Sequence, residues 1–163
     1  MSICGHWIEG MEIVMEVHPM QSVSIVGTWN LISAKAQNPN DDVIHLYGED
    51  PSGMLMYVAK GYMVAVLMRP GRSRFVSGDP LGGTSEEIKE AFEGFDAYCG
   101  TYGVNAEKRT VTHHVKARRF PNWEGTDQLH YFEFSGTQLI LKTAPIQALG
   151  TEWIVSLIWE QMA

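Results

Sequence analysis

The sequence predicts an all-β protein, a single antiparallel up-and-down β-barrel with one short amphipathic helix. Short runs that alternate apolar and polar residues dominate the chain, and Gly, Pro, Asn and Asp separate them. The length of 163 residues suits one domain, and the 16 glycines fit a protein with many turns. Antiparallel strands joined in sequence close readily into a barrel, which removes exposed sheet edges, and an open sandwich is the competing fold.

The alternation predicts nine strands. They cover residues 27–36, 42–48, 53–59, 61–69, 97–104, 109–118, 127–135, 137–143 and 152–161. The predicted turns between them contain Asn38-Pro39-Asn40-Asp41, Asp50-Pro51-Ser52-Gly53, Lys60-Gly61 and Ser135-Gly136. A barrel of about eight strands has room for filling side chains or for one small ligand.

One segment departs from the alternation and predicts a helix. Thr84 and Glu87 have the spacing of a capping box, which marks a helix start. Apolar residues then recur at helical spacing, at Ile88, Ala91, Phe92 and Phe95. We expect a short helix that packs by this face on the barrel, and a lid across the barrel mouth is the alternative.

Residues 1–23 are predicted to be an N-terminal extension, and residues 24–163 the β-barrel domain. The first twenty residues lack the basic start of a signal peptide, and three glutamates interrupt their apolar stretch. The extension is interpreted as a frayed tail or as a short strand that closes one barrel end. Alternative start positions are Met11, Met15 and Met20.

The formal net charge of −7 argues against a nucleic-acid partner, because neutralising phosphates needs a surplus of Lys and Arg. Short basic clusters at residues 69–74 and 116–119 are interpreted as solvated loops or strand ends. No apolar run approaches the ~20 residues of a membrane span. Cys4 and Cys99 do not suggest a disulfide framework, so a cytoplasmic location is expected.

Side chains alternate across a strand, so each predicted strand has an inner and an outer face. Within residues 110–118, His113 shares the apolar face and is predicted to point inward, whereas His114 and Arg118 point outward. His130 is predicted to face the interior for the same reason. The other residues predicted to point inward are Trp29, Leu31, Ser33, Tyr98, Gly100, Tyr102, Val104, Val111, Val115, Ala117, Phe132, Phe134, Trp153, Val155, Leu157 and Trp159.

An apolar, aromatic interior with a few polar groups is typical of a small-molecule pocket. The predicted ligand-binding residues are Trp29, Tyr57, Met63, Tyr98, Tyr102, His113, Trp123, His130 and Phe132. The first hypothesis is the binding of a small hydrophobic metabolite, as a carrier or sensor, by a monomer or homodimer. No cofactor is expected, and no metal either, because His113 and His114 are adjacent and face opposite ways.

Two other functions remain open. One is a cofactor-independent isomerase or cyclase acting on a small apolar, polyketide- or terpene-like substrate. It would use His113 as general acid or base, with Tyr98 or Tyr102 as proton donor or orienting group. The other is a filled barrel that self-associates through exposed Met54, Met56 and Tyr62.

His113 and His130 are predicted to lie near each other if their strands pair. Burial favours the neutral imidazole, which both donates and accepts a hydrogen bond. Protonation of one histidine in an apolar chamber is therefore expected to weaken ligand binding below about pH 6.

Six sequence pieces, in order, resemble the bacterial and fungal lipocalin-like domain proteins over residues 25–161. The pieces are Ile25-Val26-Gly27-Thr28-Trp29, Gly53-Met54-Leu55-Met56-Tyr57 with Gly61-Tyr62-Met63, Ala97-Tyr98-Cys99-Gly100-Thr101-Tyr102, Val111-Thr112-His113-His114-Val115, Pro121-Asn122-Trp123-Glu124-Gly125-Thr126 and Leu157-Ile158-Trp159-Glu160. The resemblance implies a lipocalin-like barrel that binds a small apolar molecule. His130 and Gln161 depart from the family pattern, which usually has Arg at both positions. The contact that a late Arg makes with the opening Trp in lipocalins is therefore expected to be weaker at Trp29, or made differently.

Overall fold

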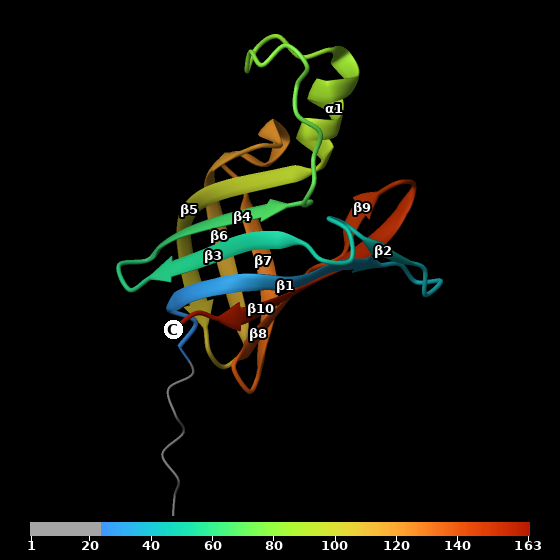
Figure 1. The fold of residues 1–163 in the computed structure, drawn as a ribbon. Coiled ribbons are helices and arrows are strands. Elements are labelled where there is room, and N and C mark those ends of the chain that lie inside the picture. The colour runs from blue at the N-terminus through green and yellow to red at the C-terminus, as the bar shows by residue number, and fades with distance from the viewer. Residues whose placement is uncertain (1–23) are drawn as a thin grey trace, which may run out of the picture.

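The computed structural model describes residues 24–163, which form a closed antiparallel barrel (Figure 1). The predicted extension and Cys4 lie outside the described residues. Ten strands form one sheet in the order β2-β1-β3-β4-β5-β6-β7-β8-β10-β9, and an additional pairing of β1 with β10 closes the ring. Eight strands therefore make the barrel, and β2 and β9 flank it.

The elements follow the predicted order. The barrel strands are β1 (Gly27–Gln37), β3 (Ser52–Val58), β4 (Tyr62–Met68), β5 (Phe95–Asn105), β6 (Thr110–Arg118), β7 (Asp127–Ser135), β8 (Gln138–Thr143) and β10 (Thr151–Gln161). The other elements are β2 (Val43–His45), the helix α1 (Ser85–Glu93), the 3-10 turn η1 (Pro121–Trp123) and β9 (Ile146–Ala148). The predicted up-and-down barrel is confirmed, and the open sandwich is wrong.

The strand predicted at residues 42–48 is too long, because only Val43–His45 pairs with β1. The backbone of Leu46 still donates a hydrogen bond to β1, but Gly48 then adopts a φ of 83° and the chain turns away. Leu46 and Tyr47 consequently pack against the barrel core instead of extending a strand.

A short hairpin that the alternation does not predict precedes the last barrel strand. Ile146–Ala148 pairs with the start of β10. Leu149 and Gly150 reverse the chain between the two strands with positive φ angles of 52° and 78°. Three residues are too few to show a period of two, which is why the pattern misses β9.

Two β-bulges decide which side chains face the interior. Pairing registers show one extra residue at Ile32 in β1 and one at Lys116 in β6. Each extra residue reverses the alternation beyond it. The inward positions predicted for Ser33 and Ala117 are therefore wrong, since Ala34 is buried and Ala117 is exposed. The outward position predicted for Arg118 is also wrong, because Arg118 lines a cavity in the barrel.

One residue near the end of β5 also differs from the prediction. The alternation predicts Val104 inside the barrel, but its side chain is 44% exposed. The neighbouring strand β4 pairs with β5 only as far as Thr101, so Val104 lies beyond the closed part of the wall.

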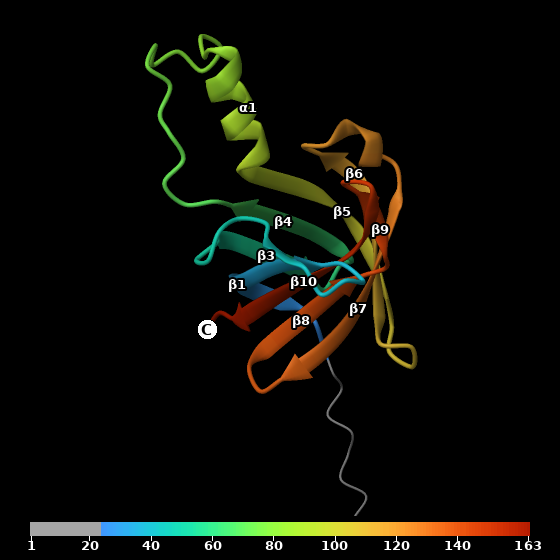
Figure 2. The same cartoon turned by 90° about the vertical axis from the view of Figure 1, so that its right-hand side faces the viewer.

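The predicted helix is confirmed as α1, but its predicted packing is wrong. Thr84 and Glu87 form the capping box. Ile88 and Phe92 are about half exposed, and no residue of α1 is buried. The helix instead stands off the barrel beside the start of β5 (Figures 1 and 2). No helix among residues 24–163 is long and apolar enough to cross a membrane.

Large side chains fill the end of the barrel where β1 begins and β10 ends. The largest fully buried ones are Trp29, Trp159, Tyr57, Ile25, Leu55, Leu139, Leu141, His113 and Val111. Trp29 donates from Nε1 to the Ile25 carbonyl at 3.0 Å, and its ring centroid lies 6.1 Å from that of Phe134. Within the described part of the chain no cation stacks on this ring. A backbone carbonyl and an aromatic ring therefore hold Trp29 where an Arg is absent.

Candidate ligand-binding site

A cavity of about 220 Å³ lies at the other end of the barrel, where β5 and β7 begin and β4, β6 and β8 end. Its apolar and aromatic lining is Leu46, Tyr47, Leu67, Tyr98, Trp123, Ile146, Val155 and Leu157. Its polar lining is Asp96, Arg118, Arg119, Gln128, His130 and Thr143. Apolar walls with a few polar groups are the usual composition of a small-molecule site.

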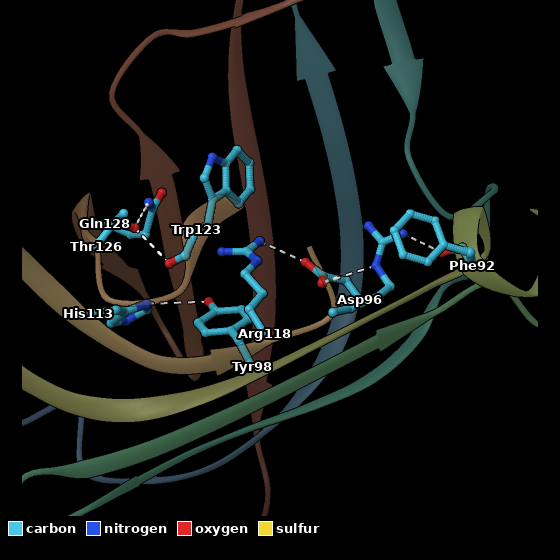
Figure 3. A network of polar contacts seen from close by, with 9 residues as sticks. Phe92, Asp96, Tyr98, His113, Arg118, Trp123, Thr126 and Gln128 are labelled. Carbon is cyan, nitrogen blue, oxygen red and sulfur yellow. Dashed lines mark hydrogen bonds and ion pairs between the residues drawn. The ribbon is translucent and has the colours of Figure 1, made fainter. Parts of the chain in front are cut away.

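Arg118 anchors a polar network in this cavity (Figure 3). Its Nη2 donates to Oδ2 of Asp96 at 2.7 Å, and Nε of Arg119 donates to Oδ1 of the same carboxylate at 3.4 Å. The guanidinium carbon lies 4.5 Å and 4.3 Å from the ring centroids of Tyr98 and Trp123. Cation–π contacts on both sides fix the plane of the guanidinium.

This ion pair is largely removed from water. The side chains of Arg118 and Asp96 are only 11% and 7% exposed. Nε of Arg118 is buried and has no hydrogen-bond partner within residues 24–163. A buried donor without a partner is costly, so this edge of the guanidinium is an unusual feature of the cavity.

Beneath the cavity, His113 lies between two tyrosines. The Tyr57 hydroxyl is 2.5 Å from Nε2 of His113, and the Tyr98 hydroxyl is 3.3 Å from Nδ1. A neutral imidazole donates from one nitrogen and accepts at the other, so one tyrosine accepts and the other donates. Burial lowers the pKa of His113 well below its usual value and raises the pKa of both tyrosines. The triad is therefore neutral over the physiological range.

The ring of His130 packs against that of His113, with centroids 4.4 Å apart and planes inclined by 34°. β6 pairs with β7 in a register that sets His130 opposite Val111, as the predicted proximity of the two histidines requires. Nδ1 of His130 lies 3.2 Å from the Gln128 carbonyl, which only accepts, so Nδ1 carries the proton. Burial lowers the pKa of His130 to about 4. The weakening of ligand binding predicted below about pH 6 is thus expected nearer pH 4 instead.

The predicted ligand-binding residues divide into two groups. Three line the cavity, namely Tyr98, Trp123 and His130. The others belong to the packed barrel beneath it, namely Trp29, Tyr57, Met63, Tyr102, His113 and Phe132. Of the residues predicted for catalysis, only Tyr98 reaches the cavity. The hydroxyl of Tyr102 donates instead to the Val58 carbonyl at 3.1 Å.

The charged residues of the site are not among the predicted site residues. Extending the alternation back by two residues from Tyr98 would have placed Asp96 on the inner face. The sequence pattern does not predict that Arg118 points inward. The bulge at Lys116 reverses the side to which Arg118 points, and the neighbouring basic residues suggest a solvated strand end. Leu46 and Tyr47 lie in the strand predicted at residues 42–48, but the pattern does not show that pairing stops at His45 and that both side chains line the cavity. Ile146 belongs to β9, which the alternation does not predict.

Two larger hollows lie on the outside of the barrel. One, of about 620 Å³, is lined by outward side chains such as Lys35, Lys142 and Glu152. The other, of about 440 Å³, includes Cys99 and His114, and His114 Nδ1 is 2.6 Å from the exposed carboxylate of Asp127. Asn38 is the one buried polar residue that lines the larger hollow, whereas the cavity inside the barrel brings together buried Asp96 and His130 and is the better candidate site.

A family model described as a lipocalin-like domain matches residues 26–162. The chain belongs to the lipocalin-like domain family. This lipocalin-like domain is 33% identical over 107 residues to the 4'-hydroxy-3'-methoxypropiophenone carrier protein ppsC of Aspergillus oryzae, and the match covers 61% of this chain and 96% of that protein. The crystal structure of a lipocalin-like protein from Bacteroides uniformis superposes with a TM-score of 0.43 at 14% identity, over 84% of this chain and 97% of that one.

Proposed function

We propose that this lipocalin-like domain is a carrier or sensor that holds one small, mainly apolar aromatic molecule in the cavity at the mouth of the barrel. The observation that carries the proposal is the cavity itself, enclosed by strand ends and lined by rings and aliphatic side chains around a few polar groups. Apolar walls supply affinity and the sparse polar groups supply orientation.

The size of the cavity limits the ligand. A volume of about 220 Å³ is below the roughly 300–1,000 Å³ of pockets for drug-sized molecules. Tyr98 and Trp123 offer aromatic faces and edges to a flat ring. A single substituted ring fits these limits better than a long chain or a fused polycycle.

The relative supports this class of ligand. The Aspergillus oryzae protein is named as a carrier of 4'-hydroxy-3'-methoxypropiophenone, a one-ring aromatic ketone with a hydroxyl and a methoxy group. We infer a ligand of similar size and chemistry for this chain, in a monomer or homodimer located in the cytoplasm.

An isomerase or cyclase is less well supported. His113, the predicted general acid or base, is fully buried, and both ring nitrogens are engaged by Tyr57 and Tyr98. A base within hydrogen-bond reach of a substrate proton is a geometric requirement for such catalysis. His113 does not line the cavity and does not meet this requirement.

Calorimetric titration tests the carrier proposal with a panel of one-ring aryl ketones and phenols, beside fatty acids of increasing length. We expect saturable 1:1 binding of one-ring compounds. Val155→Trp, which fills the cavity, should abolish it. Ile154→Trp on the outer face of the same strand should not. Failure of the folded protein to bind any one-ring compound would refute the proposal.

A further inference from the structure

We propose that Arg118 makes this cavity selective for an acidic aromatic ligand, which it binds through one ionised oxygen such as a phenolate. This inference rests on the proposed function and adds the charge state of the ligand. It depends on the position of the guanidinium, on the charge of the cavity wall and on the hydrogen-bonding capacity of His130.

The guanidinium group of Arg118 is fixed in position and has a free hydrogen-bond donor. Tyr98 and Trp123 clamp its two faces, and Nη2 is committed to Asp96. Figure 3 shows the other end of the group pointing away from Asp96, toward the side where His113 and Gln128 lie. Nη1 makes no hydrogen bond within residues 24–163 and, unlike Nε, is not shut off from the cavity. A planar fork with free donors in a pocket shielded from water matches an anionic oxygen.

The charges around the cavity do not cancel. Arg118 and Arg119 both contact the single carboxylate of Asp96, so two cations face one anion. The other titratable groups of the lining are Tyr47, Tyr98 and His130, and burial holds each of them in its neutral form by shifting its pKa. The cavity wall therefore carries one net positive charge, which an anionic ligand would neutralise.

A purely structural role for Arg118 accounts for less of this arrangement. Asp96 would keep an ion-pair partner in Arg119 without it. A side chain that served only to neutralise Asp96 would not need two aromatic rings to hold it in the cavity wall. The position of the guanidinium is explained by a ligand that uses its free edge.

His130 directs the ionised oxygen to Arg118. Its only proton is on Nδ1 and is donated to the Gln128 carbonyl, so its Nε2 is an acceptor. An acceptor repels an ionised oxygen and attracts a hydroxyl. The anionic end of the ligand therefore belongs at Arg118, and a hydroxyl on the ligand would belong at His130.

The chromogenic pair 4-nitrophenol and 4-nitroanisole tests this inference. The two molecules have nearly the same shape, but only the phenol ionises, and its phenolate is read by visible absorbance. We expect the parent protein to bind the phenolate at least about tenfold more tightly than the neutral phenol. By linkage, this preference lowers the pKa of the bound probe by about one unit. The anisole should bind at least about tenfold more weakly than the phenolate.

Arg118→Gln should remove the preference, and Arg118→Lys should keep part of it because the charge remains. Lys116→Gln is the matched control, since it removes the same charge two residues away on the outer face of β6 and should behave as the parent. Thermal melting checks that each variant is folded. If Arg118→Gln does not fold, the comparison of phenolate and phenol binding is made with Arg118→Lys instead.

The outcomes separate the inference from the proposed function. Equal binding of the phenol and the anisole, or an unshifted probe pKa in the parent, would overturn the inference and leave the carrier proposal standing. Binding of neither probe by folded parent protein would count against both. An unchanged preference in Arg118→Gln would also overturn the inference.

Discussion

The two ends of the barrel are made by the same eight strands, yet one end is solid and the other holds a cavity. At the solid end, two Trp rings and several leucines exclude solvent. At the hollow end, the wall includes an ion pair, a histidine and segments that lie beside the barrel. The alternating pattern is similar at both ends, so an aromatic interior does not by itself locate a pocket.

The two histidines whose rings are in contact mark the boundary between these ends. His113 is fully buried, and both of its nitrogens contact tyrosines. His130 lines the cavity and uses only one nitrogen within the protein. The same residue type therefore serves the packed core in one case and is available to a ligand in the other, at a ring separation of 4.4 Å.

The largest expected effect on stability comes from truncating one leucine side chain to alanine at each end of the barrel. Leu139→Ala, in the solid end, should lower the free energy of unfolding by about 4 kcal/mol, because its neighbours cannot collapse into the space. Leu157→Ala, beside the cavity, should cost about half as much and admit larger ligands. Urea unfolding and ligand titration measure both effects. Equal costs would show that the hollow end is as tightly packed as the solid end.

Substituting Gly100 of β5, which lies opposite the bulge in β6, tests how tightly the two strands pack there. A Cβ on Gly100 would lie 2.0 Å from the His114 carbonyl oxygen, so Gly100→Ala should cost about 3 kcal/mol of stability. Gly103→Ala is the control on the same strand, where the nearest atom would be 3.9 Å away and little change is expected. Circular dichroism melts compare the two. An unchanged melting temperature in Gly100→Ala would mean that the backbone at the bulge can move aside to make room for the added Cβ.

Stability should depend on pH through the two histidines. Because burial lowers the pKa of His130 to about 4, the unfolded chain binds more protons than the folded one between pH ~6.5 and ~4. Stability should therefore be constant above this window and fall as pH falls through it, by about 3 kcal/mol for His130 and further for His113.

Chemical denaturation at a series of pH values measures this slope. His130→Gln should remove the part due to His130, while His114→Gln on the outer face should leave it in place. A flat pH profile in the parent would place both histidines in a more polar environment than the structure gives them.

The smallest expected effect concerns two tyrosine hydroxyls. Tyr57→Phe leaves a buried nitrogen of His113 without its partner and should cost about 2 kcal/mol. Tyr102→Phe loses an exposed bond to the Val58 carbonyl, where water can replace the hydroxyl, and should cost less than about 1 kcal/mol. Thermal denaturation of both variants gives the ranking, and the reverse order would contradict the neutral triad at His113.

Local patterns in the sequence are enough to predict the barrel, the order of its strands and the burial of His113 and His130. These follow from period-two alternation, from turn residues such as Gly61 and Gly136 with their positive φ angles, and from the capping box at Thr84. All of these are local relations between residues a few positions apart. They predict which residues are strand and which face is apolar.

The position of the cavity and the identity of its lining residues depend on how the strands pair in the closed barrel. One extra residue at Lys116 turns Arg118 inward, and its partner Asp96 lies 22 residues earlier in the chain. Leu46 reaches the cavity just beyond the point where β2 stops pairing with β1, and Ile146 reaches it from a strand of three residues. A bulge and a strand end are set by how neighbouring strands pair, so their effect on facing appears only when the sheet is closed.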